Sequence, residues 1–184
     1  MRDRWFPGII AGETVVGIAL EEGKKHHPEK IALKAERSGN GFKLTGAKQF
    51  VVQGSSADML IVAARTAGAV GETAGLTLFA VDKDAAGLSI DAARTVDSAM
   101  AARLDLNGVE VNADAVIGDV DGGWAVLSKM LNAGRTGSAA EMVGVGTGAM
   151  DLTFDYLKQR KQFGRVIGEF QALQHRAAHL YGEM

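Results

Sequence analysis

Near the end of the sequence, an arginine and an aromatic residue are spaced so that they could bind a phosphorylated, flat-ringed ligand. The segment Tyr156 to Gln171 reads YLKQRKQFGRVIGEFQ and contains Arg160 and Phe163. An arginine at a helix end presents a planar fork of donors that suits a pyrophosphate, and a neighbouring aromatic ring can pack on a flat ring system. The alternative is a basic helix end that complements the helix dipole, with Lys158 and Arg160 as its charges and Phe163 packed on the turn.

Composition narrows the classes of function. The 184 residues are 47% hydrophobic and 23% charged, which suits a soluble globular protein with one good core or two modest ones. A formal net charge of -2 gives no basic footprint, so we expect no nucleic-acid ligand. The absence of cysteine excludes disulfides, thiolate catalysis and Cys-based metal sites. No apolar run suits a membrane span or a signal peptide, so we expect a cytoplasmic protein.

The first part of the chain has the pattern of an antiparallel β domain. Short runs rich in Val, Ile, Leu and Phe alternate with Gly, Asn, Asp and Ser at intervals of about ten residues. The segment Ser38-Gly39-Asn40-Gly41 is the best hairpin signal, because Gly and Asn accept the positive φ of tight turns. Strands in this number predict a barrel or a sandwich. The predicted strands are 14–20, 30–37, 41–53, 58–65, 75–82, 88–95, 101–107 and 109–117.

After Asp121-Gly122-Gly123 the hydrophobic period becomes helical, which predicts one long helix to about residue 160 with Asp121 as a possible N-cap. Each glycine inside a helix costs roughly 1 kcal/mol relative to alanine, so we expect this helix to be buried against partners. A turn at 163–168 and a second helix from Glu169 follow. The glycines inside the long helix are Gly134, Gly137, Gly144, Gly146 and Gly148.

This order of elements resembles the acyl-CoA dehydrogenase family over nearly the whole chain. The segment Gly46 to Val52 resembles the family's G-x-K-x-W-I-T strand, and Ile18 to Glu21 resembles its V-T-E segment. The resemblance implies an α+β fold: an antiparallel β-barrel or sandwich middle domain over 1–120, then a long helix and the start of a helical-bundle domain over 121–184. The residues that match the family's R-x-x-F-G-x-x-I-x-x-x-Q signature are Arg160, Phe163, Gly164, Ile167 and Gln171.

The resemblance also implies FAD-dependent α,β-dehydrogenation of an acyl-CoA thioester. It implies a homo- or hetero-oligomer that shares FAD across subunits, with an electron-transfer flavoprotein-type acceptor as a further partner. In that arrangement one group of residues approaches the ADP half of FAD and another lines the isoalloxazine. The first group is Arg160, Gln162, Phe163 and Gln171, and the second is Leu20, Phe50, Val51 and Val52.

Several positions depart from the family pattern. Leu20 stands for the threonine of V-T-E and Val52 for that of W-I-T, so both hydroxyls are lost. Phe50 keeps a ring but has no indole N–H. The family's G-S-D segment is missing, and Lys24-Lys25-His26-His27 stands in that region. These departures predict a flavin site with few polar contacts.

The sequence also departs from the family pattern at the position of the catalytic base. In most of the family, a glutamate in the second half of the C-terminal helical domain removes the α proton, and this sequence does not contain that half. In other members the glutamate lies just before the arginine that is Arg135 here, where this chain has Gly134. Glu141 lies about two helical turns away, which makes it a poor substitute. We therefore predict no catalytic residue in this chain.

Other constellations carry less weight. Gly144-x-Gly146-x-Gly148 lies inside a helical period rather than between a strand and a helix, so it is no dinucleotide fingerprint. His26-His27 in a charged loop is typical of solvent-facing histidines, and His175 and His179 have no evident third ligand, so we predict no metal site. Three hypotheses stay open: an FAD-dependent acyl-CoA dehydrogenase present as a partial or divergent chain, a non-catalytic partner subunit of a heteromeric dehydrogenase, and an inactive structural fragment.

Overall fold

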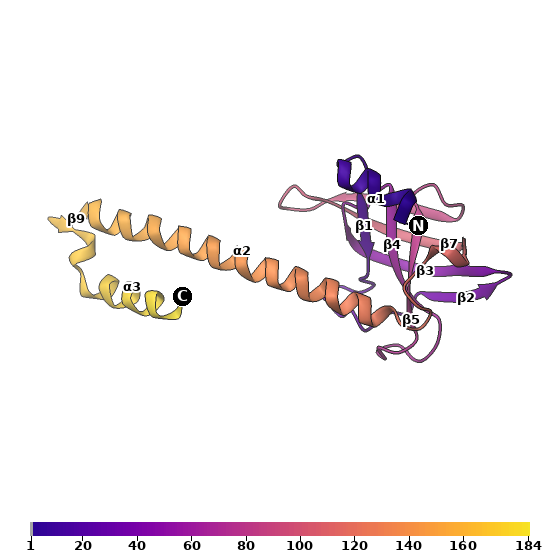
Figure 1. Cartoon of the computed structure of the whole chain (residues 1–184). Helices are drawn as coiled ribbons and strands as arrows, with labels where there is room; N and C mark the ends of the chain where they lie inside the picture. The colour runs from indigo at the N-terminus through magenta and orange to yellow at the C-terminus, as the bar shows by residue number, and fades with distance from the viewer. Residues whose placement is uncertain (1) are drawn as a thin grey trace. The chain divides into compact units, whose positions relative to one another are not determined.

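A computed structural model describes residues 2–184, which form two compact units. The β unit, Met1–Ser128, contains α1 (Arg2–Ala11), the main sheet and the beginning of α2 (Gly123–Gln159). The helical unit, Lys129–Met184, contains the rest of α2 and, after a short hairpin, α3 (Gln171–Glu183) (Figure 1). Among the described residues, no helix is long and apolar enough to cross a membrane.

The β unit is built on one eight-stranded sheet in the order β6-β7-β3-β2-β4-β5-β8, with β1 paired to β4. The predicted α+β fold is confirmed, but the sheet is mixed, because β1 runs parallel to β4 and β2 meets β4 in a parallel pair. Every other neighbouring pair is antiparallel. The strands are β1 (Val16–Ala19), β2 (Lys34–Ser38), β3 (Gly41–Val52), β4 (Met59–Arg65), β5 (Leu76–Asp82), β6 (Leu88–Arg94), β7 (Met100–Asn112) and β8 (Val116–Ile117).

Turn chemistry explains one prediction that held and one that did not. The predicted hairpin is confirmed, since Ser38 pairs with Gly41 across a two-residue turn. The predicted strands 101–107 and 109–117 are wrong in their division, because β7 continues through Gly108. Gly108 has a φ of +71° and lies where the β3–β7 register shifts, so it is accommodated as a bulge instead of ending the strand.

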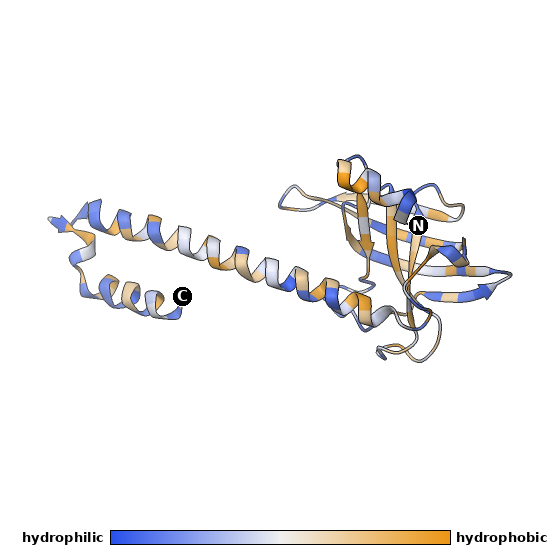
Figure 2. Ribbon diagram, in the orientation of Figure 1, coloured by the Kyte–Doolittle hydropathy of each residue, from blue (hydrophilic) through white to orange (hydrophobic). Residues whose placement is uncertain are grey.

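The core of the β unit is formed by buried apolar side chains of this sheet. β4 and β5 are buried on both faces and read as continuous apolar runs, which Figure 2 shows as hydrophobic ribbons. Phe42 of β3 meets Phe79 of β5 edge to face, with ring centroids 5.1 Å apart. Burial of such a side chain contributes about 1.5–3 kcal/mol. This core fixes the positions of β1 and β3, whose ends carry the predicted flavin residues.

Asp121, two residues before α2, is joined to the sheet by hydrogen bonds. The backbone N–H of Asp121 donates to Thr77 Oγ1 at 2.8 Å, and Thr66 Oγ1 donates to Asp121 Oδ1 at 2.5 Å. The predicted N-cap role of Asp121 is wrong, because α2 begins at Gly123 and Gly122 therefore holds the N-cap position. A Cβ on Gly123 would lie 2.8 Å from the carbonyl oxygen of Leu76, so glycine permits this close approach.

Beyond its first turns α2 has an exposed surface. Within residues 2–184, an added Cβ on Gly134, Gly137, Gly144 or Gly148 would meet nothing within 4 Å. Apolar side chains such as Met142 and Leu152 are about three-quarters exposed. At Gly146 an added Cβ would lie 3.1 Å from Met184 Cε at the end of the chain. The other four glycines meet nothing in the described residues, so the partners expected from them stay a prediction.

Candidate functional site

The end of α2 carries an arginine with a free side chain. The backbone N–H of Arg160 bonds Tyr156 O at 2.9 Å, and its carbonyl accepts the N–H of Ile167 at 2.8 Å. These two bonds fix the main chain at the point where the helix becomes a hairpin. Within the described residues, the exposed guanidinium takes part in no side-chain hydrogen bond or ion pair, so its planar fork is free to bind an anion.

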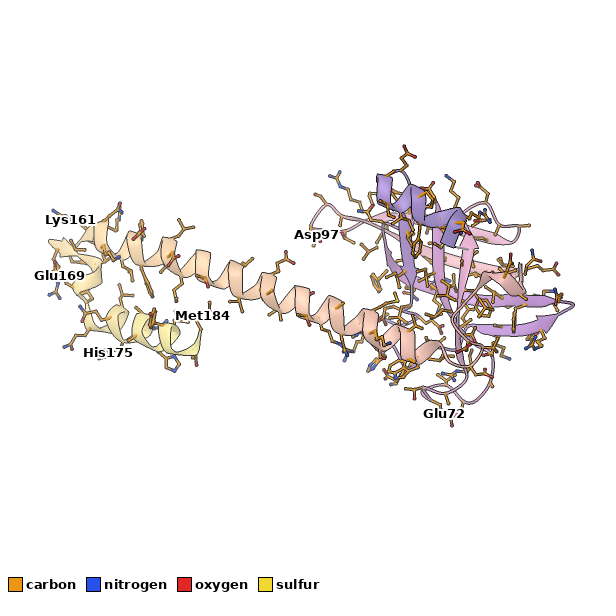
Figure 3. All side chains as sticks on the ribbon, viewed as in Figure 1. Glu72, Asp97, Lys161, Glu169, His175 and Met184 are labelled. Atoms are coloured by element: carbon orange, nitrogen blue, oxygen red, sulfur yellow. The ribbon has the colours of Figure 1, made fainter. Side chains whose placement is uncertain are left out.

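A tight hairpin follows Arg160. β9 (Lys161–Gln162) pairs with β10 (Arg165–Val166), and the two residues between them have φ values of +54° and +80°. Two positive φ values in a two-residue loop are typical of the type I′ turn. Gly164 suits such a position, whereas Phe163 is unusual there. Lys161 and Glu169 mark the two sides of this connection in Figure 3.

The conformation of Phe163 presents its ring to solvent. Phe163 is 91% exposed, and its ring centroid lies 6.2 Å from that of Phe170. The guanidinium of Arg165 stacks over Phe170 at 4.2 Å, which holds the base of the turn. An exposed aromatic side chain in a strained backbone conformation is a reason to look for function. The four predicted ADP-side residues, all exposed, are Arg160, Gln162, Phe163 and Gln171.

The end of β3, in the β unit, also carries an exposed phenylalanine with a positive φ. The β3–β7 register shifts between Lys48 and Val51, and Phe50 at this bulge has a φ of +52°. The bulge leaves Phe50 59% exposed and Val52 65% exposed, while Val51 between them is fully buried. Leu20, directly after β1, is only 8% exposed. Of the four residues predicted to line a flavin ring, two therefore lie in the core and two at the surface.

A buried lysine ties these two segments together. Lys48 is fully buried, and its ammonium donates to Leu20 O at 3.1 Å and to Glu22 Oε1 at 2.7 Å. Burial lowers the pKa of Lys48 to about 8, although the charge of Glu22 acts in the opposite direction. Sequence reasoning missed this pair. The one available signal was the lysine of the G-x-K segment, which lies on a face of β3 that is otherwise apolar.

Because Phe50 has a positive φ, we expect glycine to be more stable than alanine at this position, the reverse of the usual order in a strand. A left-handed conformation costs a non-glycine residue roughly 1–2 kcal/mol, which glycine avoids. We expect Phe50→Gly to be more stable than Phe50→Ala by about 1 kcal/mol, measured by urea unfolding. At Val52, which lacks a positive φ, the order should be the ordinary one with alanine more stable. If alanine is the more stable at both positions, the strained bulge is absent.

Two domain families and several known proteins match this sequence. Residues 19–109 match the acyl-CoA dehydrogenase middle domain, and residues 121–184 match the acyl-CoA dehydrogenase C-terminal domain. The rat mitochondrial short/branched chain specific acyl-CoA dehydrogenase is 34% identical over 179 residues, which cover 96% of this chain and 41% of that protein. The 3-(aryl)acrylate reductase of Clostridium sporogenes is 31% identical over 97% of this chain and 48% of its own length.

The chain belongs to the acyl-CoA dehydrogenase family. An acyl-CoA dehydrogenase structure from Geobacillus kaustophilus matches with a TM-score of 0.87 and 27% identity, covering 99% of this chain and 49% of that one. The chain thus spans less than half the length of these acyl-CoA dehydrogenase relatives.

Among residues 2–184, the catalytic base of an acyl-CoA dehydrogenase stays unassigned. Glu141 is exposed on α2, and Gly134 lies directly before Arg135 on the same helix. The neighbouring Arg135 donates to Asn132 Oδ1 at 3.5 Å along the same helix. Throughout residues 2–184, no three His, Cys, Asp or Glu side chains gather in a way that would hold a metal ion. His179 lies 3.5 Å from Glu183 on α3.

Proposed function

We propose that this chain supplies two flavin-binding walls of an FAD-dependent acyl-CoA dehydrogenase. The observation that carries the proposal is the pair of exposed phenylalanines, Phe50 and Phe163, each held at a positive φ in a segment that matches a family motif. Two such outliers at two motif positions are more than packing requires, because neither ring is buried.

The helical unit fits the ADP half of FAD. The guanidinium of Arg160 has no partner in the described chain and suits a pyrophosphate, which accepts two parallel N–H bonds. Phe163 offers a free aromatic face to a flat ring. Gln162 and Gln171 add amide groups that both donate and accept. In the proposal, this half of FAD is bound largely by a neighbouring subunit of a homo- or hetero-oligomer.

The β unit fits the flavin ring through apolar contact. Phe50 and Val52 at the end of β3 are exposed, and Val51 between them in sequence is buried. Leu20 lies directly after β1, and Lys48 bonds its carbonyl, so this segment is fixed relative to β3. None of these four side chains carries a hydroxyl, so they contribute packing and water exclusion more than hydrogen bonds.

FAD, when bound, would accept a hydride from the β carbon of an acyl-CoA thioester. The residues of this chain orient the cofactor and exclude water; removal of the α proton is assigned to none of them. An electron-transfer flavoprotein-type protein is the proposed acceptor. A second candidate, a non-catalytic subunit of a heteromeric dehydrogenase, is favoured by the missing hydroxyls at Leu20 and Val52 and by Gly134.

The test is titration of the chain with FAD, alone and mixed with an intact family member, followed by flavin fluorescence. We expect Arg160→Met to weaken FAD binding by about 10- to 100-fold, because a charge-assisted hydrogen bond contributes about 1.5–3 kcal/mol. Arg176→Met on α3 removes the same charge from an exposed position outside the motif and should leave binding unchanged. The proposal would be overturned if the chain does not bind FAD alone and the mixture binds no more FAD than the intact relative does by itself.

A further inference from the structure

The bulge that exposes Phe50 is bonded to the loop of residues 20–33, which connects β1 to β2. Of the described residues of β7, none is the register partner of Gln49 or Phe50. The backbone N–H of Gln49 donates instead to Glu21 O at 2.7 Å, and its side-chain Nε2 donates to Glu22 O at 3.2 Å. The position of the bulge therefore depends on the beginning of this loop.

The ion pair of Glu22 and Lys48 lies next to these bonds in the sequence and joins the same two segments. The carboxylate of Glu22 accepts the ammonium of Lys48 at 2.7 Å and the backbone N–H groups of Ala32 at 2.8 Å and Leu33 at 3.0 Å. The ammonium also donates to Leu20 O at 3.1 Å. A buried network in which each charge has several partners rigidifies the segments that it joins. These bonds and those of Gln49 are called the clamp below.

Stability alone gives a weak reason for a buried ion pair. Replacement of such a pair by apolar side chains of similar volume is often neutral or stabilising, because two charges no longer have to leave water. Lys48 is nevertheless fully buried on β3. Buried ion pairs can instead select one arrangement of the chain over others. The arrangement selected here is that of Leu20, two residues before Glu22, and Phe50, two residues after Lys48.

We propose that Lys48 and Glu22 are positioning residues for the isoalloxazine ring of FAD. They act through the clamp, which holds Leu20 and Phe50 in a fixed arrangement as parts of one apolar wall. Lys48 is fully buried, so its charge acts through the Leu20 carbonyl and the Glu22 carboxylate and does not touch the ring. This inference rests on the proposed flavin function, and it assigns the clamp a role in ring binding beyond its contribution to folding.

The test measures binding of riboflavin, which carries the ring without a phosphate, and of ADP, by flavin fluorescence and isothermal titration of the whole chain. The double variant Glu22→Gln, Lys48→Met removes both charges, so that no buried charge is left without a partner. We expect it to bind riboflavin at least tenfold more weakly than wild type. Its binding of ADP should be unchanged, because the pyrophosphate is assigned to Arg160.

A matched control separates positioning from stability. Leu44→Ala, in the same strand and four residues before Lys48, removes a fully buried side chain and leaves a cavity in the core. This variant destabilises the β unit without removing a group of the clamp. We expect it to bind riboflavin as wild type does under conditions in which both are folded. A loss of riboflavin binding equal to that of the double variant would overturn the positioning role.

Hydrogen exchange tests the clamp without any ligand. The amide of Gln49 should exchange at least tenfold faster in the double variant, measured relative to the core amide of Phe79 in β5 so that a change in overall stability cancels. An unchanged ratio would overturn the clamp. Wild-type binding of riboflavin and FAD that the double variant retains would overturn the positioning role and leave the proposed function intact. A wild-type chain that binds neither ligand would overturn the ring wall and the inference with it.

Discussion

Replacement of Arg65 by methionine should destabilise the β unit by about 3–5 kcal/mol, since buried charged groups and the acceptors they serve are costly to leave unpaired. The side chain lies at the end of β4 and is only 8% exposed. Its guanidinium bonds main-chain carbonyls instead of a carboxylate, and it joins two loops that are distant in sequence. The acceptors are Ile31 at 2.8 Å, Glu29 at 3.4 Å, Ala67 at 3.2 Å, Glu72 at 2.8 Å and Ala74 at 3.1 Å.

Urea unfolding followed by circular dichroism measures this effect. Arg65→Lys keeps the charge but lacks the planar fork, so it should fall between wild type and Arg65→Met. Arg94→Met, in exposed β6, should change the free energy of unfolding by less than about 0.5 kcal/mol. A loss at Arg65 no larger than that at Arg94 would show that the loop containing Glu72 (Figure 3) does not depend on the guanidinium.

Features determined by neighbouring residues could be predicted from the sequence. The hairpin at Ser38–Gly41 follows from two residues that accept a tight turn, and α2 follows from a helical period that extends to Gln159. The parallel pairing of β1 with β4 could not be predicted, because it depends on a contact between segments more than forty residues apart, such as Val16 with Met59. The pattern of apolar residues is the same for either direction of pairing.

The buried charges were unpredictable for a related reason. Lysine and arginine are ordinarily exposed, so a sequence assigns them to the surface unless a partner is evident. The partners of Lys48 are groups of the 20–33 loop, and those of Arg65 are backbone carbonyls of that loop and of the loop between β4 and β5, so only the folded chain brings them together. The flavin-side prediction met the same limit: simple alternation along β3 gives no sign of the bulge that exposes Phe50 and buries Val51.

Removal of the partner of Lys48 should have the second large effect. Glu22→Gln leaves an ammonium group that is fully buried without a counter-charge, and we expect a loss of about 3–5 kcal/mol in the free energy of unfolding. The double variant Glu22→Gln, Lys48→Met removes the uncompensated charge and should recover part of this loss. A double-mutant cycle in urea measures the coupling, and additive effects of the two single changes would contradict a direct ion pair.

The pH dependence gives an independent check on the same pair. Because burial lowers the pKa of Lys48 from 10.5 to about 8, the unfolded chain binds more protons at this residue between these two values than the folded chain does. The contribution of Lys48 to stability therefore rises with pH from about 8 towards 10.5. Lys48→Met lacks that rise, so the stability of wild type relative to this variant should grow over the same window. A difference that shrinks with rising pH would mean that Glu22 outweighs burial and raises the pKa of Lys48 in the folded protein.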